Sequence, residues 1–94
     1  MKSYPRQLAV ALGYDPEEDD APRVLARGAG LVAEHIRRLA ETFGVPVREE
    51  RELAEALVRL DVGAGIPEEL YLAVAEVLAF IYRAESRYAR EDAV

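Results

Sequence analysis

The chain has 94 residues, which supports one domain, because two domains would each fall below the usual folding size. Its 12 basic and 18 acidic residues give a net charge of −6, which argues against a nucleic-acid partner. The absence of cysteine excludes disulfides, thiolate metal sites and cysteine nucleophiles, and one histidine alone builds no histidine metal site. Composition therefore predicts a globular domain with no metal or other cofactor.

No targeting or membrane-spanning segment is visible in the sequence. The longest largely apolar stretch, 70–82, is interrupted by Glu76, whereas a membrane helix needs about 20 apolar residues. The first six residues have no apolar run behind their charges, so they are not a signal peptide. We expect a cytoplasmic protein that does not insert into a membrane.

The first half of the chain predicts two strands. Residues 7–14 alternate with period two, with large apolar side chains on one face and alanine or glycine on the other, which suits a strand covered on both sides. An acidic loop, 15–20, follows, and Pro22 opens a second strand over 23–27. A third strand is expected over 45–49, on a weaker signal.

Three segments predict helices, over 29–43, 52–60 and 67–87. The first carries one apolar stripe: Val32, Ile36, Leu39 and Phe43. The last carries two stripes of similar spacing: Leu70, Val74, Val77 and Ile81, and Tyr71, Ala75, Leu78 and Tyr82. A helix this apolar needs cover on more than one side, so its second stripe is either buried or a docking surface for a protein partner.

The element order is therefore β-β-α-β-α-α, a small single α/β domain over 1–94 with a three- to four-stranded sheet flanked by helices. The ends, 1–6 and 88–94, are expected to be flexible. Three strands are few for a sheet that is buried on both faces, so we expect an open edge or a partner that covers it. An open edge is compatible with a weak homodimer but does not require one.

A glycine motif lies between the second strand and the first helix. Gly28-Ala29-Gly30 begins a G-x-G-x-x-A pattern, and Glu49 follows about 20 residues later, as in dinucleotide-binding proteins. In dinucleotide-binding proteins this turn binds a pyrophosphate at the N-terminus of the helix. Arg27 replaces the apolar end of the strand, and the second mononucleotide half does not fit in the remaining length. The motif favours a structural turn; a small nucleotide-binding domain is the alternative function.

Other polar groups give weaker signals. The acidic loop lacks the alternating ligands, central glycine and distal glutamate of a calcium loop, so it is interpreted as solvated. His35 lies outside the apolar stripe and has no cysteine or second histidine as a partner. The Glu68-Glu69 pair compensates the positive end of the last helix, and nothing distinguishes the Glu49-Glu50 pair as an acid–base couple.

Several segments together carry a resemblance to one family. They are Ala9–Leu12, Tyr14-Asp15, Ala21-Pro22, Val24–Ala29, Val45–Val47 with Glu49, Leu53-Ala54 with Ala56-Leu57, Gly63, and most specifically Ile66–Tyr71 followed by Ala73–Ala79. From about residue 5 to residue 83, the chain resembles the C-terminal cytoplasmic domain of the FlhB/YscU family, the export-gate switch proteins of flagellar and type III secretion systems.

The resemblance implies a non-enzymatic protein-interaction module that acts in the recognition or switching of export substrates. Its implied partners are the membrane proteins of the flagellar export gate and export substrates such as rod and hook subunits, which places it in the cytoplasm or peripherally at the gate. The family's substrate-docking patch corresponds to Ala21, Pro22, Ala75 and Leu78.

The resemblance also includes one departure with chemical consequences. The family cleaves itself in an Asn-Pro-Thr-His motif by cyclisation of the asparagine, and that motif falls here on Tyr4-Pro5-Arg6-Gln7. The chain has no asparagine anywhere, so we expect no self-cleavage. It starts almost where the family's cut would fall, so it resembles the released C-terminal fragment, without the family's upstream strand and membrane helices.

Overall fold

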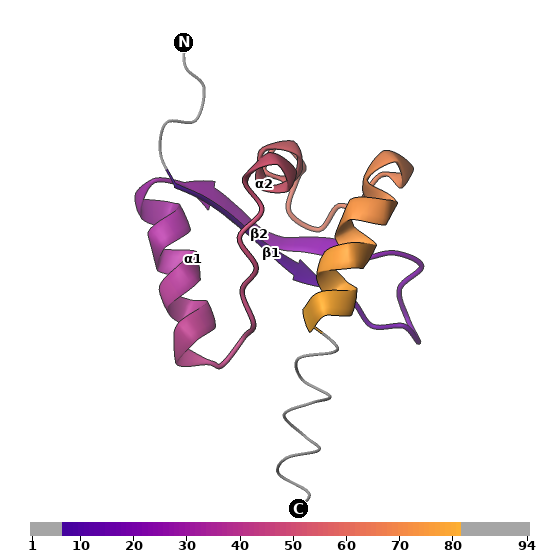
Figure 1. Ribbon diagram of the computed structural model, residues 1–94, viewed down its shortest axis with the longest axis horizontal. Helices are drawn as coiled ribbons and strands as arrows, with labels where there is room; N and C mark the ends of the chain where they lie inside the picture. The colour runs from indigo at the N-terminus through magenta and orange to yellow at the C-terminus, as the bar shows by residue number, and fades with distance from the viewer. Residues whose placement is uncertain (1–6, 82–94) are drawn as a thin grey trace, which may run out of the picture.

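The computed structural model describes residues 7–81, and its elements are arranged around a pair of strands (Figure 1). They are β1 (Leu8–Gly13), β2 (Arg23–Ala29), α1 (Leu31–Thr42), α2 (Arg51–Leu57) and a 3₁₀ turn, η1 (Glu68–Leu70), which leads into a helix over 71–81. The expected flexibility of 1–6 and 88–94, and the continuation of the last helix to 87, lie outside the described residues.

The two strands are antiparallel and form the whole sheet within residues 7–81. Their register shifts once: Ala11 pairs with Ala26, but Leu12 pairs with Val24, so Leu25 is an extra residue on β2. Such a bulge increases the local twist. The α/β class is confirmed, while the predicted count of three to four strands is wrong.

The expected third strand is a connector instead. Residues 45–50 form no strand, because Pro46 lacks a backbone donor. The free edge of β2 is taken by 63–66, where the Val24 N–H donates to the Ala64 carbonyl at 3.0 Å and the Gly63 N–H donates to the Val24 carbonyl at 2.7 Å. Gly63 has a φ of 90°, a conformation that glycine adopts without strain.

The core lies between the sheet, α2 and the 71–81 helix. Its buried members are Val24, Leu57, Ile66 and Val74. Half-buried side chains pack around them, among them Val10 and Leu12 from the predicted apolar face of β1: Val10, Leu12, Leu53, Leu60, Leu70 and Leu78. Full burial of one such aliphatic side chain is worth about 1.5–3 kcal/mol. Of the first predicted stripe of the last helix, Leu70 and Val74 belong to this core.

Helix α1 packs differently from its predicted stripe. Ala33 is buried and Ile36 is half-buried, whereas Val32, Leu39 and Phe43 are exposed. Of the four residues of that stripe only Ile36 is partly covered, so the stripe does not mark the side of the helix that packs on the strands. The helix approaches the strands through the small side chain of Ala33, which leaves the larger apolar side chains on its flank. Figure 1 shows α1 at one end of the strands and the 71–81 helix at the other.

Candidate functional site

A pocket of about 250 Å³ opens between the end of the acidic loop and the 71–81 helix. It contains all four residues of the predicted docking patch, which come from two segments far apart in the sequence. Within residues 7–81 the lining is Tyr14, Asp20, Ala21, Pro22, Ile66, Tyr71, Val74, Ala75 and Leu78. The structure thus brings the four patch residues together in one mainly apolar concavity.

The acidic loop is folded back on itself, which positions Ala21 and Pro22. The Asp19 carboxylate accepts a hydrogen bond from the Asp15 N–H at 3.0 Å and one from Arg23 Nε at 3.2 Å. The Arg23 guanidinium also donates to the Gly63 carbonyl at 3.2 Å. The Asp15 N–H, and to a lesser degree Arg23, lower the pKa of Asp19 below its ordinary value. The loop is therefore tied to the 63–66 segment at the edge of β2.

Pro22 itself connects the pocket to that edge. Its carbonyl accepts the Ile66 N–H at 3.0 Å, which brings the buried Ile66 side chain beneath the pocket. The proline ring fixes φ near −65°, so this wall is rigid. Pro67 follows in an extended conformation, and η1 then turns the chain into the 71–81 helix.

The helix supplies the opposite wall. Val74 is only 1% exposed and forms part of the pocket floor. Leu78 is half-buried and also packs against the core, whereas Ala75 and Tyr71 are exposed. The described members of the second predicted stripe, Tyr71, Ala75 and Leu78, therefore line the pocket, and Leu78 also packs against the core. Its last member, Tyr82, lies outside the described residues.

The described lining of the pocket is mainly apolar and has few polar groups. Asp20 is the one carboxylate among the described residues of the pocket wall, and Tyr14 and Tyr71 in that wall are each about half exposed. Among the residues that the structure describes, the wall includes no serine, threonine, histidine or lysine. Within residues 7–81, no group of three or more histidine or carboxylate side chains is arranged to hold a metal ion.

Sequence reasoning missed part of this lining. Ile66 comes to Pro22 through the pairing of 63–66 with β2, for which the sequence carries no strand signal. The sequence pattern predicts Tyr14 at the end of the first strand and Asp20 in a solvated loop. The ion pair between Asp19 and Arg23 closes that loop and brings Tyr14 and Asp20 to the pocket. The signal for this closure in the sequence is the spacing of the pair, an acidic residue followed four positions later by a basic residue.

The glycine motif spans the end of β2 and the junction with α1, with Gly30 as the turn residue. Gly28 lies inside β2, and the Val32 side chain occupies the space where a β-carbon on Gly28 would lie. The strands are antiparallel, and Glu49 lies in the connector, where it pairs with Arg37 at 2.8 Å. The parallel β-α-β arrangement that the motif requires is absent from residues 7–81.

The remaining predicted residues gather at no site. His35 is exposed on α1. Of the degenerate cleavage motif, Tyr4, Pro5 and Arg6 lie outside the described residues, and Gln7 is exposed, with its carbonyl accepting the Gly30 N–H at 2.8 Å. No helix within the described part of the chain has the length and apolar character that crossing a membrane requires.

Comparison with known proteins settles the family. Residues 4–81 match the family model described as "FlhB HrpN YscU SpaS Family". The chain belongs to the FlhB/YscU family. It is 49% identical over 79 residues to YlqH of Bacillus subtilis, covering 84% of this chain and 85% of that protein. It is also 44% identical over 78 residues to the flagellar biosynthetic protein FlhB of Aquifex aeolicus, covering 82% of this chain but 22% of FlhB.

Solved structures of the family share the fold. The PscU C-terminal domain superposes with a TM-score of 0.78 at 36% identity and covers 82% of this chain and 99% of that domain. The cytoplasmic domain of FlhB from Shewanella putrefaciens gives a TM-score of 0.83 at 34% identity, over 87% of this chain and 64% of that domain. The FlhB/YscU-type chain thus spans most of YlqH but about a fifth of FlhB, and the resemblance seen in the sequence is confirmed.

Proposed function

We propose that this chain is a non-enzymatic protein-interaction module of the flagellar, or type III, export apparatus, and that it acts in the recognition or switching of export substrates. The observation that carries the proposal is the pocket in which Ala21, Pro22, Ala75 and Leu78 meet. The relatives of this chain include flagellar biosynthetic proteins and a hypersensitivity response secretion protein.

The pocket suits a short apolar segment. Ala21 and Ala75 are small enough to admit an incoming side chain, Val74 and Leu78 provide an apolar floor, and Pro22 offers a rigid wall without a donor. Apolar surface removed from water contributes about 25 cal/mol per Å², but ordering a peptide costs part of that gain. Binding is therefore weak, which suits substrates that must be released.

The proposed partners are the membrane proteins of the export gate and export substrates such as rod and hook subunits. In this proposal residues 1–94 act as one domain on the cytoplasmic side of the gate. A net charge of −6 does not favour a nucleic-acid partner.

The proposal includes no self-cleavage. Cyclisation needs an amide side chain that attacks its own carbonyl, and Tyr4 has none. The chain contains no asparagine that could replace it. A docking role requires only the pocket.

A strain that lacks this chain tests the proposal. We expect it to assemble fewer hooks and filaments, and we expect the wild-type chain to restore assembly. An Ala75→Asp chain, produced at the same level, should not restore it, because a charge would be placed in the apolar wall. The matched control is Leu72→Asp, an exposed position of the same helix outside the pocket. Full restoration by Ala75→Asp would refute the docking role.

A further inference from the structure

One ion pair spans the loop wall of the apolar pocket. Asp19 and Arg23 are four positions apart, and the three residues between them, Asp20, Ala21 and Pro22, all line the pocket. The Arg23 Nε atom lies 3.2 Å from a carboxylate oxygen of Asp19, so the pair closes a ring over this stretch. Among the described residues, none forms a backbone hydrogen bond with Asp20 or Ala21. The position of this wall therefore depends on its two ends.

The Asp19 end belongs to a turn that closes on itself. The Asp19 N–H donates to the Asp15 carbonyl at 2.8 Å, and the Asp15 N–H donates to the Asp19 carboxylate at 3.0 Å. The Glu17 N–H donates to the Asp15 carboxylate, also at 3.0 Å. These hydrogen bonds are internal to the loop. They fix the shape of the turn, but they do not fix where the turn lies on the rest of the molecule.

Arg23 anchors the turn to the sheet. Its backbone pairs with Gly13 of β1 and forms an isolated bridge with Gly65. Its guanidinium donates in two directions, to the Asp19 carboxylate through Nε and to the Gly63 carbonyl at 3.2 Å. The rigid fork of an arginine suits this double contact, because several donors leave one planar group in fixed directions. One side chain thus joins the turn to the edge of the core.

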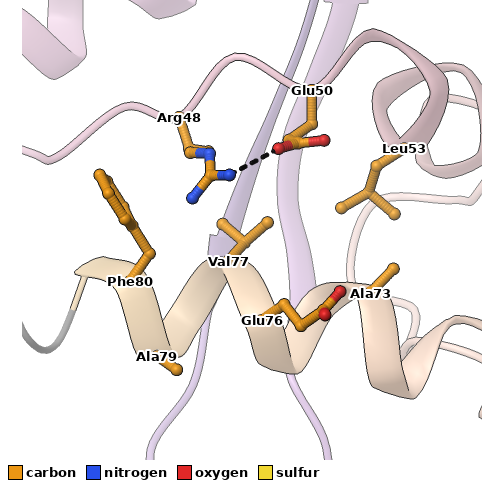
Figure 2. A pocket seen from close by; sticks show the side chains of 8 residues that line it. All are labelled: Arg48, Glu50, Leu53, Ala73, Glu76, Val77, Ala79 and Phe80. Carbon is orange, nitrogen blue, oxygen red and sulfur yellow. Dashed lines mark ion pairs between the residues drawn. The ribbon is translucent and has the colours of Figure 1, made fainter.

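The opposite wall of the pocket is held by other contacts. A second hollow, of about 460 Å³, lies on another face of the helix that supplies this wall, and Arg48 and Glu76 belong to its lining. Figure 2 shows the connector crossing above the helix there, with its Arg48 guanidinium 4.4 Å from the centroid of the Phe80 ring and 2.9 Å from the Glu50 carboxylate. None of the described residues of this hollow lines the apolar pocket. A change at Arg23 should therefore move the loop wall and leave the helix wall in place.

We propose that Arg23 is a positioning residue for the apolar pocket, and that its ion pair with Asp19 holds Ala21 and Pro22 where a partner segment docks. This inference rests on the proposed function and adds what sets the affinity of the site. Without the pair the wall is in place for only part of the time, and the apparent affinity falls by that fraction. The energies of exposed ion pairs correspond to a loss of up to about fivefold.

Binding of a purified hook subunit to the full chain tests the proposal. Arg23→Met keeps the aliphatic stem but removes the donors, and we expect it to bind about three- to fivefold more weakly than wild type. Arg23→Lys keeps a cation next to Asp19 and should restore most of the affinity. The matched control, Arg38→Met, breaks an ion pair of the same spacing with Glu34 on α1, outside the pocket, and should bind as wild type does. Circular dichroism should show each variant folded at the temperature of the measurement.

A double-mutant cycle separates positioning from direct contact with the partner. Asp19→Ala should weaken binding by a similar factor, and adding Arg23→Met should then weaken it little further, because both changes break one pair. Asp19→Ala leaves the strand residue unchanged, so it carries the test even where Arg23→Met does not fold. A second readout needs no partner. Arg23→Met should speed hydrogen exchange of the Ile66 N–H, which donates to the Pro22 carbonyl.

Any one of three results would overturn the proposal. If wild type binds the subunit and both Arg23→Met and Asp19→Ala bind it equally well, the pair does not set the affinity, and the proposed function still stands. Fully additive losses from the two changes would make both residues direct contacts of the partner. An unchanged exchange rate of the Ile66 N–H would show that the wall stays in place without the pair. Absence of binding by the wild-type chain would instead refute the proposed function, and this inference with it.

Discussion

The side chain of Val32 occupies the space in which a β-carbon on Gly28 would have to lie. This contact fixes the junction between β2 and α1, because the first turn of the helix lies directly against the end of the strand. Residue 28 requires glycine because a larger side chain would collide with Val32. Its backbone conformation does not require glycine, since its φ is not in the left-handed region. The glycine of the dinucleotide-like motif is thus explained by packing.

Gly28→Ala should lower the free energy of unfolding by about 1–3 kcal/mol, because the added methyl group collides with the Cβ and Cγ1 atoms of Val32. Urea denaturation measures the change. The matched control is Gly65→Ala, where a β-carbon meets nothing within 4 Å. An alanine at residue 28 that is as stable as wild type would contradict the tight contact.

The closure of the acidic loop should depend on pH through Asp19. Its pKa lies below the ordinary aspartate value because the Asp15 N–H, and then Arg23, stabilise the carboxylate. A lowered folded pKa means that the contribution to stability is present above the unfolded pKa and is lost as the pH falls through the folded value. We expect the loop to loosen only when the pH falls below the ordinary aspartate pKa.

The amide shift of Asp15 should report this transition in an NMR titration, since that N–H donates to the Asp19 carboxylate. The Asp19→Asn variant is the control, and its Asp15 amide should show no corresponding acid step. A midpoint for Asp19 at or above the ordinary aspartate pKa would be inconsistent with the hydrogen bonds described.

The outer edge of β1 is open within residues 7–81. Val24 directs its N–H and carbonyl to Ala64 and Gly63, so these groups point away from β1. Leu12 pairs with Val24 and accordingly directs its own N–H and carbonyl to the opposite edge of the sheet. No backbone hydrogen bond from another described segment reaches that edge.

Hydrogen exchange should therefore alternate along β1. We expect the amides of Val10 and Leu12 to exchange faster than those of Ala9 and Ala11, which face β2. Uniform protection would show that the edge is covered, and analytical ultracentrifugation would then distinguish a dimer through this edge from a covered monomer. A weak dimer is compatible with the open edge but is not required by it.

The purified chain should not cleave itself. After prolonged incubation near neutral pH, mass spectrometry should find the full mass of 10.4 kDa. The reason is that Tyr4 precedes Pro5 and has no amide to cyclise. A fragment cut between these two residues would refute this chemical argument.

The two strands and the three helices could be predicted from period-two and helical patterns, but the third strand could not be judged correctly. Val45 and Val47 give the connector a strand-like pattern, yet Pro46 between them lacks a donor. Residues 63–66 take the edge of β2 instead, through a turn at Gly63 and long-range hydrogen bonds that leave no local pattern.

The candidate site was predictable only through the family resemblance. Helical spacing placed Ala75 and Leu78 on one stripe, but it did not distinguish a buried stripe from a docking surface. Whether the stripe is buried or lines a pocket depends on where the acidic loop places Ala21 and Pro22. That placement is set by tertiary contacts and leaves no local sequence pattern. The hollow around Arg48 and Glu76 depends likewise on the path of the connector across the helix.

Leu78→Asp would test docking poorly, because Leu78 also packs against the core. An unpaired charge placed there would destabilise the fold by several kcal/mol, and lost binding would then follow from unfolding. Ala75 is the better position, since it lines the pocket and is exposed.

The dissociation constant of a purified rod or hook subunit for the Ala75→Asp chain tests the central claim most directly. Circular dichroism melting should first show that this variant and the matched control Leu72→Asp are as stable as wild type. The account predicts that Ala75→Asp weakens binding by about tenfold or more, whereas Leu72→Asp stays within about twofold of wild type. A folded Ala75→Asp chain that binds the subunit as tightly as wild type would contradict the docking role of the pocket.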